Sequence, residues 1–282
     1  MPQTSRYTGS LCTEVTFLRV RVRAINPDAY IVGEIWQERG DLLDGRTYDG
    51  LMNYPLAAAI LSFVPGIHLD PRVVAQHAEI RRQTEPVDGA RFLERVERVI
   101  RGYAPAFARS MLGLVDSHDT PRFVSWCNGD RTSLRLAWLV LLTMPGAPCI
   151  YYGDEVGVIG EQDPDCRRAF PWDESVWDRG LLDTARTLVR LRRETPAFRD
   201  VDFAPLAADG HAVAYRRGTG PGAGIVAINA ADVAASLTVD LGDAEPKPFP
   251  VPGLEPAAVA RAGAGRWRID LPARSGTVAR LG

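Results

Sequence analysis

The chain has 282 residues, of which 46% are hydrophobic and 24% charged, and its formal net charge is −2. These values fit a packed globular protein of one large or two ordinary domains. They exclude the basic character of a nucleic-acid binder, and no apolar run reaches the roughly 18 residues of a membrane-spanning helix. Neither nucleic acid nor a membrane is therefore predicted as a partner.

The N-terminal segment and the cysteines bear on location. The first dozen residues contain no apolar stretch of the kind that secretory signals carry. The cysteines show neither a CxxC pair nor a metal-ligand spacing; they are Cys12, Cys127, Cys149 and Cys166. We expect reduced thiols, a cytoplasmic location and no metal site. Cys149 lies in an apolar run and is predicted to be a small buried side chain.

The first element, VTFLRVRVRAI at residues 15–25, is ambiguous. Apolar and polar residues alternate from Leu18 to Ala24, which favours a strand. However, Leu18, Val22 and Ile25 also lie on one face of a helix. The residues alone favour the strand.

Four short apolar runs follow, alternating with helix-period segments up to about residue 200. The runs are YIVGEIW (30–36), YDGLMNYP (48–55), SMLGLVDSHD (110–119) and PCIYYGDE (148–155). The helical segments are 57–63, 90–103, 131–144 and 185–195, and the third is apolar nearly all round. Residues 30–32 are predicted to be a buried strand. Strand then helix, four times over, predicts parallel βαβ units.

After about residue 200 the pattern changes to short β-like segments separated by turn residues. The segments are HAVAYRRG, GIVAINA, ASLTVDLG and RWRIDLP. No helical period intervenes, so this region is predicted to be an all-β domain, a sandwich. The boundary is expected between Pro196 and Asp200.

Polar side chains close each of the four predicted strands. They are Glu34 in the first, Asn53 and Tyr54 in the second, Asp116, Ser117, His118 and Asp119 in the third, and Tyr151, Tyr152, Asp154 and Glu155 in the fourth. In parallel α/β folds the active site gathers at the carboxyl ends of the strands. The alternative for Glu34 is a strand end that simply points to solvent.

The segment SHDTPR, residues 117–122, has two interpretations. His118 can donate to a sugar hydroxyl, and Asp119 can hold two neighbouring hydroxyls. The same letters also suit an Asp-Thr-Pro turn with a helix cap. Arg122 could neutralise Asp116 or Asp119, in a structural or a catalytic role.

Five motifs, in this order, carry a family resemblance: GEIW, YDGLMNYP, SHDTPRF, MPGAPCIYYGDEVG and DPDCRRAFPWD. Together they closely resemble the alpha-amylase family of glycoside hydrolases, and MNYP and DPDCRRAFPWD resemble its neopullulanase, cyclomaltodextrinase and maltogenic amylase branch. The resemblance covers residues 24–282. RVRAINPDAY also matches, which makes residues 15–25 the end of a helix and overrides the strand interpretation.

The resemblance implies an α/β fold: a partial (β/α)8 TIM barrel, strands five to eight, at residues 14–199, followed by a β-sandwich at residues 200–282. Residues 1–13 match nothing. It further implies a retaining hydrolase of α-glucosidic bonds in maltodextrin, cyclodextrin or pullulan-type α-glucans.

The same resemblance assigns residue roles. Glu34 takes the place of the general acid/base, Asp119 that of the transition-state stabiliser, and His118 that of a substrate-binding residue. Trp36 is a candidate for stacking on a glucose, or a core or rim side chain. Tyr151 and Tyr152 are expected to pack, and Asp165, Arg167 and Arg168 to form a structural ion-pair cluster at the edge of the cleft.

One expected part is missing from the sequence. Retaining hydrolysis needs an acid and a nucleophile roughly 5–5.5 Å apart, and the family supplies the nucleophile in a Gly-x-Arg-x-Asp motif before the GEIW acid. No such motif precedes Glu34 here, and Asp28 is too near to serve. We therefore expect the C-terminal half of an enzyme, cut by a frameshift, a truncation or a late start codon, and inactive alone. A half-barrel leaves edges unpaired, so we expect it to be poorly soluble, partly molten or self-associating.

Two alternatives remain for function, so the sequence leaves open whether the chain is itself an enzyme. The first is half of a split enzyme whose N-terminal half is a separate, complementing chain. The second is a non-catalytic carbohydrate-binding protein on an amylase-like scaffold. No cofactor is predicted; some relatives bind calcium, but mostly through segments that this sequence lacks.

Overall fold

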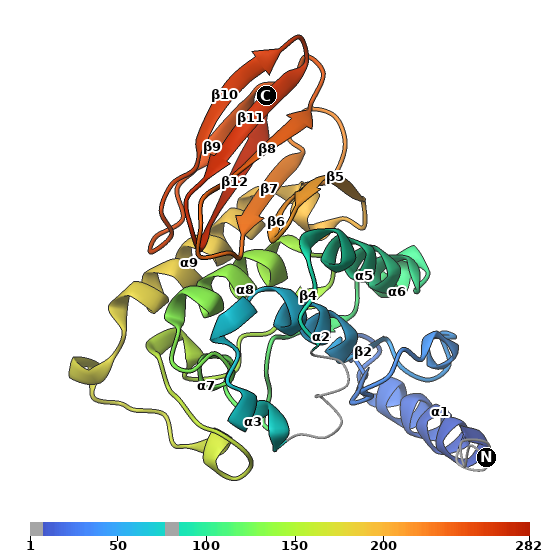
Figure 1. The fold of residues 1–282 in the computed structure, drawn as a ribbon. Helices are drawn as coiled ribbons and strands as arrows, with labels where there is room; N and C mark the ends of the chain where they lie inside the picture. Colours follow the sequence, from blue (N-terminus) through green and yellow to red (C-terminus); the bar gives the residue numbers. More distant parts are fainter. Residues whose placement is uncertain (1–7, 77–84) are drawn as a thin grey trace.

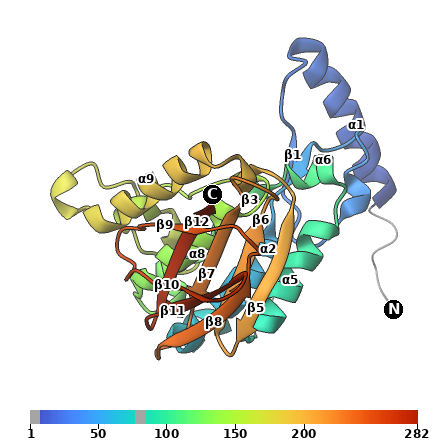
Figure 2. The ribbon, with the colours of Figure 1, turned by 90° about the horizontal axis from the view of Figure 1, so that it is seen from above.

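The computed structural model describes residues 8–76 and 85–282 (Figure 1). An α/β region forms the lower part of Figure 1, and a purely β region lies above it. Helix α1 projects away from the rest of the chain in every view (Figure 2).

The first element is a helix, α1 (Thr8–Ile25), so the strand interpretation drawn from alternation is wrong and the helix implied by the resemblance is right. Arg19 and Arg23 lie four residues apart and therefore project from one helix face. Both bind Asp49, with N–O distances of 2.7 and 2.8 Å. This shared partner fixes the C-terminal half of α1 to the segment before the second strand.

Each of the four predicted apolar runs contains or adjoins a short strand. They are β1 (Val32–Gly33), β2 (Gly50–Leu51), β3 (Leu112–Gly113) and β4 (Ala147–Pro148). β1 pairs with β2 and β3 with β4, both in parallel, and a parallel bridge joins Met52 to Leu112. The predicted parallel arrangement is confirmed. Gly50 is required where β2 passes the loop before β3, because a Cβ there would lie 2.1 Å from the Ser110 carbonyl oxygen.

The two outer strands are less buried than predicted. Tyr30 is 47% and Val32 37% exposed, and Cys149 is exposed too, so the predictions of burial at these positions are wrong. The reason is common to both places. Within the described residues, β1 has a strand neighbour only in β2, and β4 only in β3. The outer sides of β1 and β4 are open edges.

The helices lie between and beside these strands. They are α2 (Tyr54–Phe63), α3 (Pro71–Ala75), α5 (Gly89–Arg101), α6 (Pro105–Ala108), α7 (Phe123–Trp126), α8 (Arg131–Thr143) and α9 (Arg179–Glu194), with 3-10 turns η1 (Gly40–Leu42), η2 (Gly66–His68), η3 (Asp154–Val156), η4 (Asp165–Arg167), η5 (Glu174–Val176) and η6 (Pro196–Arg199). Side chains of Asp88, Asp130 and Asp178 cap α5, α8 and α9 at their N-termini, as short acids do. Helix α8 is buried along almost its whole length, as its continuous apolar sequence predicts.

The β region contains eight strands within residues 203–281. They are β5 (Phe203–Asp209), β6 (Ala212–Arg217), β7 (Gly224–Asn229), β8 (Ala235–Asp240), β9 (Pro246–Phe249), β10 (Ala258–Gly263), β11 (Arg266–Leu271) and β12 (Ser275–Leu281). A five-stranded sheet has the order β5-β6-β7-β12-β9, and a three-stranded sheet the order β10-β11-β8. All of these pairings are antiparallel.

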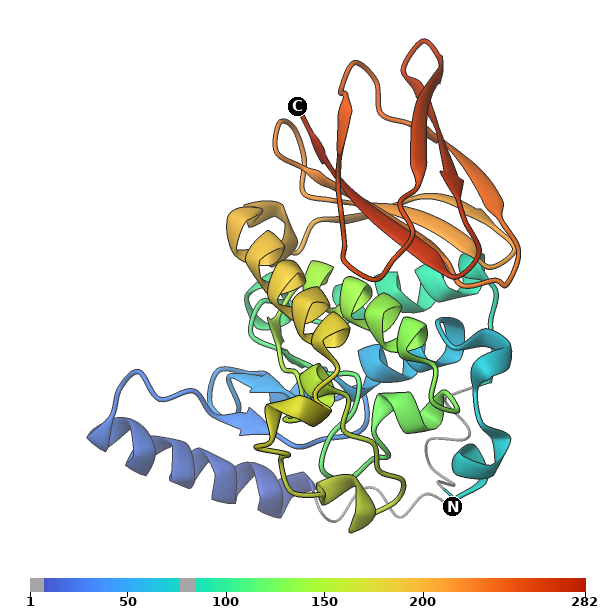
Figure 3. The ribbon, with the colours of Figure 1, turned by 90° about the vertical axis from the view of Figure 1, so that its left-hand side faces the viewer.

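The larger sheet is buried on both faces, which explains why β6 and β7 read as unbroken apolar runs. One face shares a core with the helices, through Tyr215, Val226 and Val278 among others. The other face packs on β8 and β11, through Ile225, Leu237 and Ile269 among others. Figure 3 shows this region seated on α5, α8 and α9. Within the described residues, no helix has the length and apolar character needed to cross a membrane.

Candidate active site

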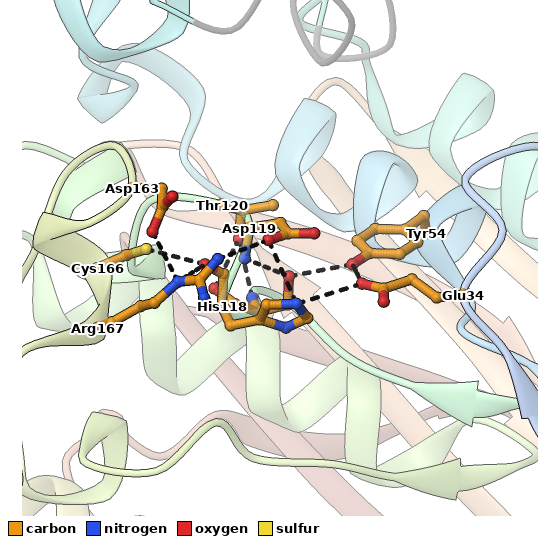
Figure 4. A network of polar contacts seen from close by, with 9 residues as sticks. Glu34, Tyr54, His118, Asp119, Thr120, Asp163, Cys166 and Arg167 are labelled. Carbon is orange, nitrogen blue, oxygen red and sulfur yellow. Dashed lines mark hydrogen bonds and ion pairs between the residues drawn. The ribbon is translucent and has the colours of Figure 1, made fainter.

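Side chains from the ends of neighbouring strands meet in one polar cluster (Figure 4). Glu34 follows β1 directly, Tyr54 begins α2 just after β2, and the turn 117–119 follows β3. Parallel strands bring their carboxyl ends to the same edge of a sheet. The polar strand endings noticed in the sequence therefore converge, and Glu34, although solvent-exposed, is not isolated.

Three of the residues predicted for the site lie together. The His118 Nε2 atom is 3.6 Å from Glu34 Oε1 and 3.3 Å from Asp119 Oδ1. One oxygen or nitrogen of each side chain lies within 4.8 Å of the others. Their side chains are 42%, 42% and 39% exposed, so they can reach a ligand from solvent. Two carboxylates beside an imidazole can bind hydroxyls and exchange a proton.

Tyr54 connects Glu34 to the turn that carries His118 and Asp119. Its hydroxyl donates to Glu34 Oε1 at 3.4 Å and lies 3.1 Å from Ser117 Oγ, which in turn accepts from the Asp119 N–H at 3.2 Å. Burial raises the pKa of Tyr54 above its ordinary value, and the nearby charges of Glu34 and Asp119 raise it further. The phenol therefore stays neutral and keeps its proton to donate.

Trp36 lies against Tyr54 and has one ring face occupied. The two ring centroids are 4.0 Å apart and the planes are nearly parallel, at 5°. The sequence left two alternatives for Trp36: stacking on a glucose, or a structural position in the core or at the rim of the site. The observed stack orients Tyr54, and Trp36 stays partly buried.

Arg167 in η4 reaches the site, whereas Arg122 does not. The Arg167 guanidinium binds Asp119 at 3.1 Å, Asp163 at 2.6 Å and the His118 carbonyl oxygen at 3.1 Å. The predicted ion-pair cluster of this loop is present in Arg168 and Asp165, 2.8 Å apart. Sequence reasoning placed Arg167 only at the cleft edge, because nothing in DPDCRRAFPWD indicates which arginine turns toward the strand ends.

Arg122 was expected to neutralise Asp116 or Asp119, but its ion pair is with Asp154, at 2.9 Å. The rings of Tyr151 and Tyr152 flank its guanidinium, with centroids 4.1 and 4.8 Å from Cζ. Their predicted packing role is therefore confirmed.

The turn predicted for SHDTPR is present, and the sugar-binding interpretation of His118 and Asp119 stays a prediction. The segment is a turn, in which Ser117 N–H donates to Thr120 Oγ1 at 2.8 Å. Asp116, rather than Asp119, accepts from the first N–H of α7, on Phe123, at 2.6 Å. His118 and Asp119 are thereby left free to face Glu34.

The donors around the carboxylates indicate what the site can hold. Arg167 and His118 both lie against Asp119, and His118 and Tyr54 both lie against Glu34. Cationic and hydroxyl donors on the same carboxylates disfavour a bound cation and suit a neutral polyol. Among the described residues, the Glu34 carboxylate contacts the side chains of Tyr54 and His118.

Comparisons with known proteins agree on one family. The alpha amylase catalytic-domain family matches residues 6–197. A cyclomaltodextrinase of Geobacillus thermopakistaniensis is 35% identical over 225 residues, and a maltogenic alpha-amylase of Bacillus acidopullulyticus is 38% identical over 178 residues. The solved structure of a Nostoc punctiforme debranching enzyme superimposes with a TM-score of 0.84 at 36% identity.

The matches cover most of this chain but a smaller fraction of each relative. The two relatives match 79% and 63% of this chain, but the chain spans only 35% and 27% of their lengths. It covers 55% of the debranching enzyme structure, with 94% of its own residues matched. Amylase-like structures thus account for almost the whole chain, as a partial TIM barrel followed by a β domain.

Proposed function

Because the chain belongs to the alpha-amylase family, we propose that its polar cluster binds α-glucans of the maltodextrin, cyclodextrin or pullulan type. The observation that carries this proposal is the convergence of Glu34, His118 and Asp119 within 4.8 Å, at the ends of parallel strands. Strands β1 to β4 then stand for strands five to eight of the barrel. The names of the matched relatives, which act on related glucans, support the substrate class.

Each residue has a proposed role. Glu34 is the general acid/base: it gives its proton to the glycosidic oxygen as the bond to the anomeric carbon breaks. Asp119 and His118 hold the hydroxyls of the sugar at the cleavage point, and the Asp119 charge stabilises the oxocarbenium-like transition state. Tyr54 orients the Glu34 carboxylate. What supports these roles is contact geometry and the exposure of the three side chains.

The chain alone is proposed to bind glucan without hydrolysing it. Retaining hydrolysis needs a second carboxylate free to attack the anomeric carbon, and Asp119 is engaged by Arg167 and His118. No Gly-x-Arg-x-Asp motif precedes Glu34 in these 282 residues. A complementing chain that pairs with the open edges of β1 and β4 would supply the missing carboxylate and restore turnover.

Calorimetric titration of the purified chain with maltotriose and β-cyclodextrin, alongside a reducing-sugar assay, tests this function. We expect binding without product. Asp119→Ala should weaken binding about 10- to 100-fold, since hydrogen bonds to a charged group are lost. Asp183→Asn, on the exposed face of α9, is the matched control and should bind as the wild type does.

Two outcomes would change the proposal. Product release that disappears in Glu34→Gln would mean that this chain holds a complete catalytic site. Absence of binding in the wild type would remove the glucan site altogether. If binding persists but no added N-terminal half ever restores turnover, the non-catalytic carbohydrate-binding alternative is favoured.

A further inference from the structure

Three ionisable side chains are buried beside the turn that carries His118 and Asp119. Asp116, Arg122 and Asp154 are 3%, 0% and 2% exposed. They come from the end of β3, the start of α7 and the start of η3. None of them belongs to the cluster in Figure 4, yet the turn that carries His118 and Asp119 runs from the first to the second of them.

The contacts among these groups leave two oxygens unaccounted for. Arg122 Nη1 donates to Asp154 Oδ1 at 2.9 Å, and Phe123 N–H donates to Asp116 Oδ2 at 2.6 Å. The other two carboxyl oxygens, Asp116 Oδ1 and Asp154 Oδ2, are buried and lack a donor within the described structure. Asp116 and Asp154 are close enough that each shifts the pKa of the other. Two carboxylates have only acceptors, so a hydrogen bond between them requires a proton.

The charge count leads to the same requirement. Two ionised carboxylates facing one guanidinium would leave an uncompensated negative charge in a buried site, which is strongly unfavourable. Arg122 Nε and Nη1 also donate to neutral acceptors, the carbonyl oxygens of Cys166 and Tyr152, and Nη2 is buried without an acceptor within the described structure. One proton shared by the two acids leaves one anion opposite one cation, and it also gives both orphaned oxygens a partner.

We propose that Asp116 and Asp154 share a single proton, and that this acid–carboxylate pair, together with Arg122, positions the turn that carries His118 and Asp119. Asp116 and Arg122 flank that turn, and Asp154 contacts both of them, so it joins the two ends of the turn. All three are positioning residues. The inference relies on the proposed function only in naming what the turn carries; the shared proton does not depend on it.

The electrostatic surroundings support a retained proton. Burial raises the pKa of both acids, and the charge of Asp116 raises that of Asp154 further, while Arg122 lowers both. The other titratable groups facing the pair and its arginine are Cys127, Cys149, Tyr151, Tyr152 and Cys166. Thiols and phenols are neutral near pH 7, so Arg122 is the only charged group among those named to face the pair.

Infrared spectroscopy of the full chain is the direct test. At pH 7 exposed carboxyl groups are ionised, so a protonated carboxyl stretching band must come from a buried acid. We expect one such band in the wild type, its loss in both Asp116→Asn and Asp154→Asn, and its retention in the exposed control Asp183→Asn. A wild-type spectrum without the band overturns the proposal, whether or not the variants fold.

Stability measurements form an independent test with a distinctive pattern. In either single Asn variant an amide N–H replaces the shared proton and one anion still faces Arg122, so both should fold. The double variant leaves Arg122 without an anion and should be destabilised by far more than the sum of the singles. Additive effects would contradict a shared proton.

The pH dependence has a defined sign. Between about pH 4, where an unfolded acid titrates, and the folded pKa, the folded chain holds one more proton than the unfolded chain. The unfolding equilibrium constant of the wild type should therefore rise by up to about 10-fold per pH unit through this window. In the single variants the unfolding equilibrium constant should lack this rise with pH. If both variants show the same dependence on pH as the wild type, the proposal is overturned.

The positioning role has its own readout, which needs no glucan. When the shared proton is lost at high pH, amide hydrogen exchange of residues 117–120 should accelerate more in the wild type than in Asp154→Asn, after correction for the intrinsic pH effect. Equal acceleration would leave the proton pair without a positioning role and would contradict that half of the proposal. Failure of glucan binding, by contrast, would affect only the proposed function.

Discussion

At the scale of single residues, the site depends on which arginine turns toward it. Arg167 and Arg168 are adjacent in the sequence, but only Arg167 contacts Asp119 and the His118 carbonyl oxygen. Arg168 binds Asp165 instead. Neighbouring residues at a short 3-10 turn point in different directions, so two adjacent arginines contact different carboxylates.

This difference predicts unequal effects of two matched substitutions. Arg167→Ala should weaken binding of maltotriose roughly 10-fold, since Asp119 loses the charged hydrogen bond that orients it. Arg168→Ala should change binding less than about twofold, because its exposed ion pair contributes little. Isothermal titration of both variants is the measurement. Equal effects would mean that Arg167 does not orient the site.

Sequence reasoning identified Glu34, His118 and Asp119, and the structure brings them together. The motifs sufficed here because Glu34 directly follows β1 and the turn 117–119 follows β3, and parallel strands bring their carboxyl ends to one edge. Arginine partners could not be predicted in the same way. Their long side chains reach several candidate acids, and only the packing of distant loops decides which acid they meet.

At the scale of elements, helix α9 is fixed to the rest of the chain through one buried arginine. Arg192 donates to the carbonyl oxygens of Leu142, Met144, Gly146 and Phe198. The Leu142 oxygen lies in the last turn of α8, those of Met144 and Gly146 lie between α8 and β4, and that of Phe198 lies in η6. Burial lowers the pKa of Arg192 to about 10, so it stays charged at neutral pH and can donate to all four oxygens.

Replacement of Arg192 should therefore be costly. In Arg192→Met the four carbonyl oxygens lose their donor, and we expect a loss of about 2–4 kcal/mol in the free energy of unfolding. Arg190→Met, on the exposed face of the same helix, should cost less than about 0.5 kcal/mol. Urea denaturation compares the two. A similar small change in both would show that backbone relaxation or water replaces the Arg192 contacts.

The elements also show where local patterns mislead. Residues 15–25 alternate like a strand, yet the shared contact of Arg19 and Arg23 with Asp49 holds them as a helix. The apolar residues 30–32 suggested burial, but Tyr30 and Val32 are exposed because β1 is an edge. Periodicity reports which side chains are apolar. It does not report whether a neighbour is present to cover them.

At the scale of the whole molecule, the helical and β regions share one core. Residues of α2, α5, α8 and α9 and of the five-stranded sheet belong to one continuous buried cluster. Arg274 reinforces the contact: it donates to the Val64 carbonyl oxygen at 2.7 Å and binds Asp130, the cap of α8, at 2.8 Å. Poor solubility, a partly molten state and self-association, the three behaviours expected from the sequence, stay predictions.

We therefore expect both regions to unfold in one calorimetric transition. Arg274→Ala should lower the midpoint of that single transition by several degrees, about 2–4 °C for each kcal/mol lost in a chain of this size. Arg268→Ala, which removes an exposed pair with Asp270 on β11, is the control and should leave the midpoint nearly unchanged. Two separate transitions, of which Arg274→Ala moves only one, would contradict a shared core.

Cys149 follows β4 at its uncovered side, and its side chain is exposed, whereas those of Cys127 and Cys166 are buried. A maleimide dye should therefore react with the Cys149 thiol in preference to the buried thiols of Cys127 and Cys166. A polypeptide that forms backbone hydrogen bonds with the open edge of β4 would shield the dye from solvent and change its emission. The emission of a dye on Cys149 would therefore report the pairing of another strand with β4, for any polypeptide that supplies that strand.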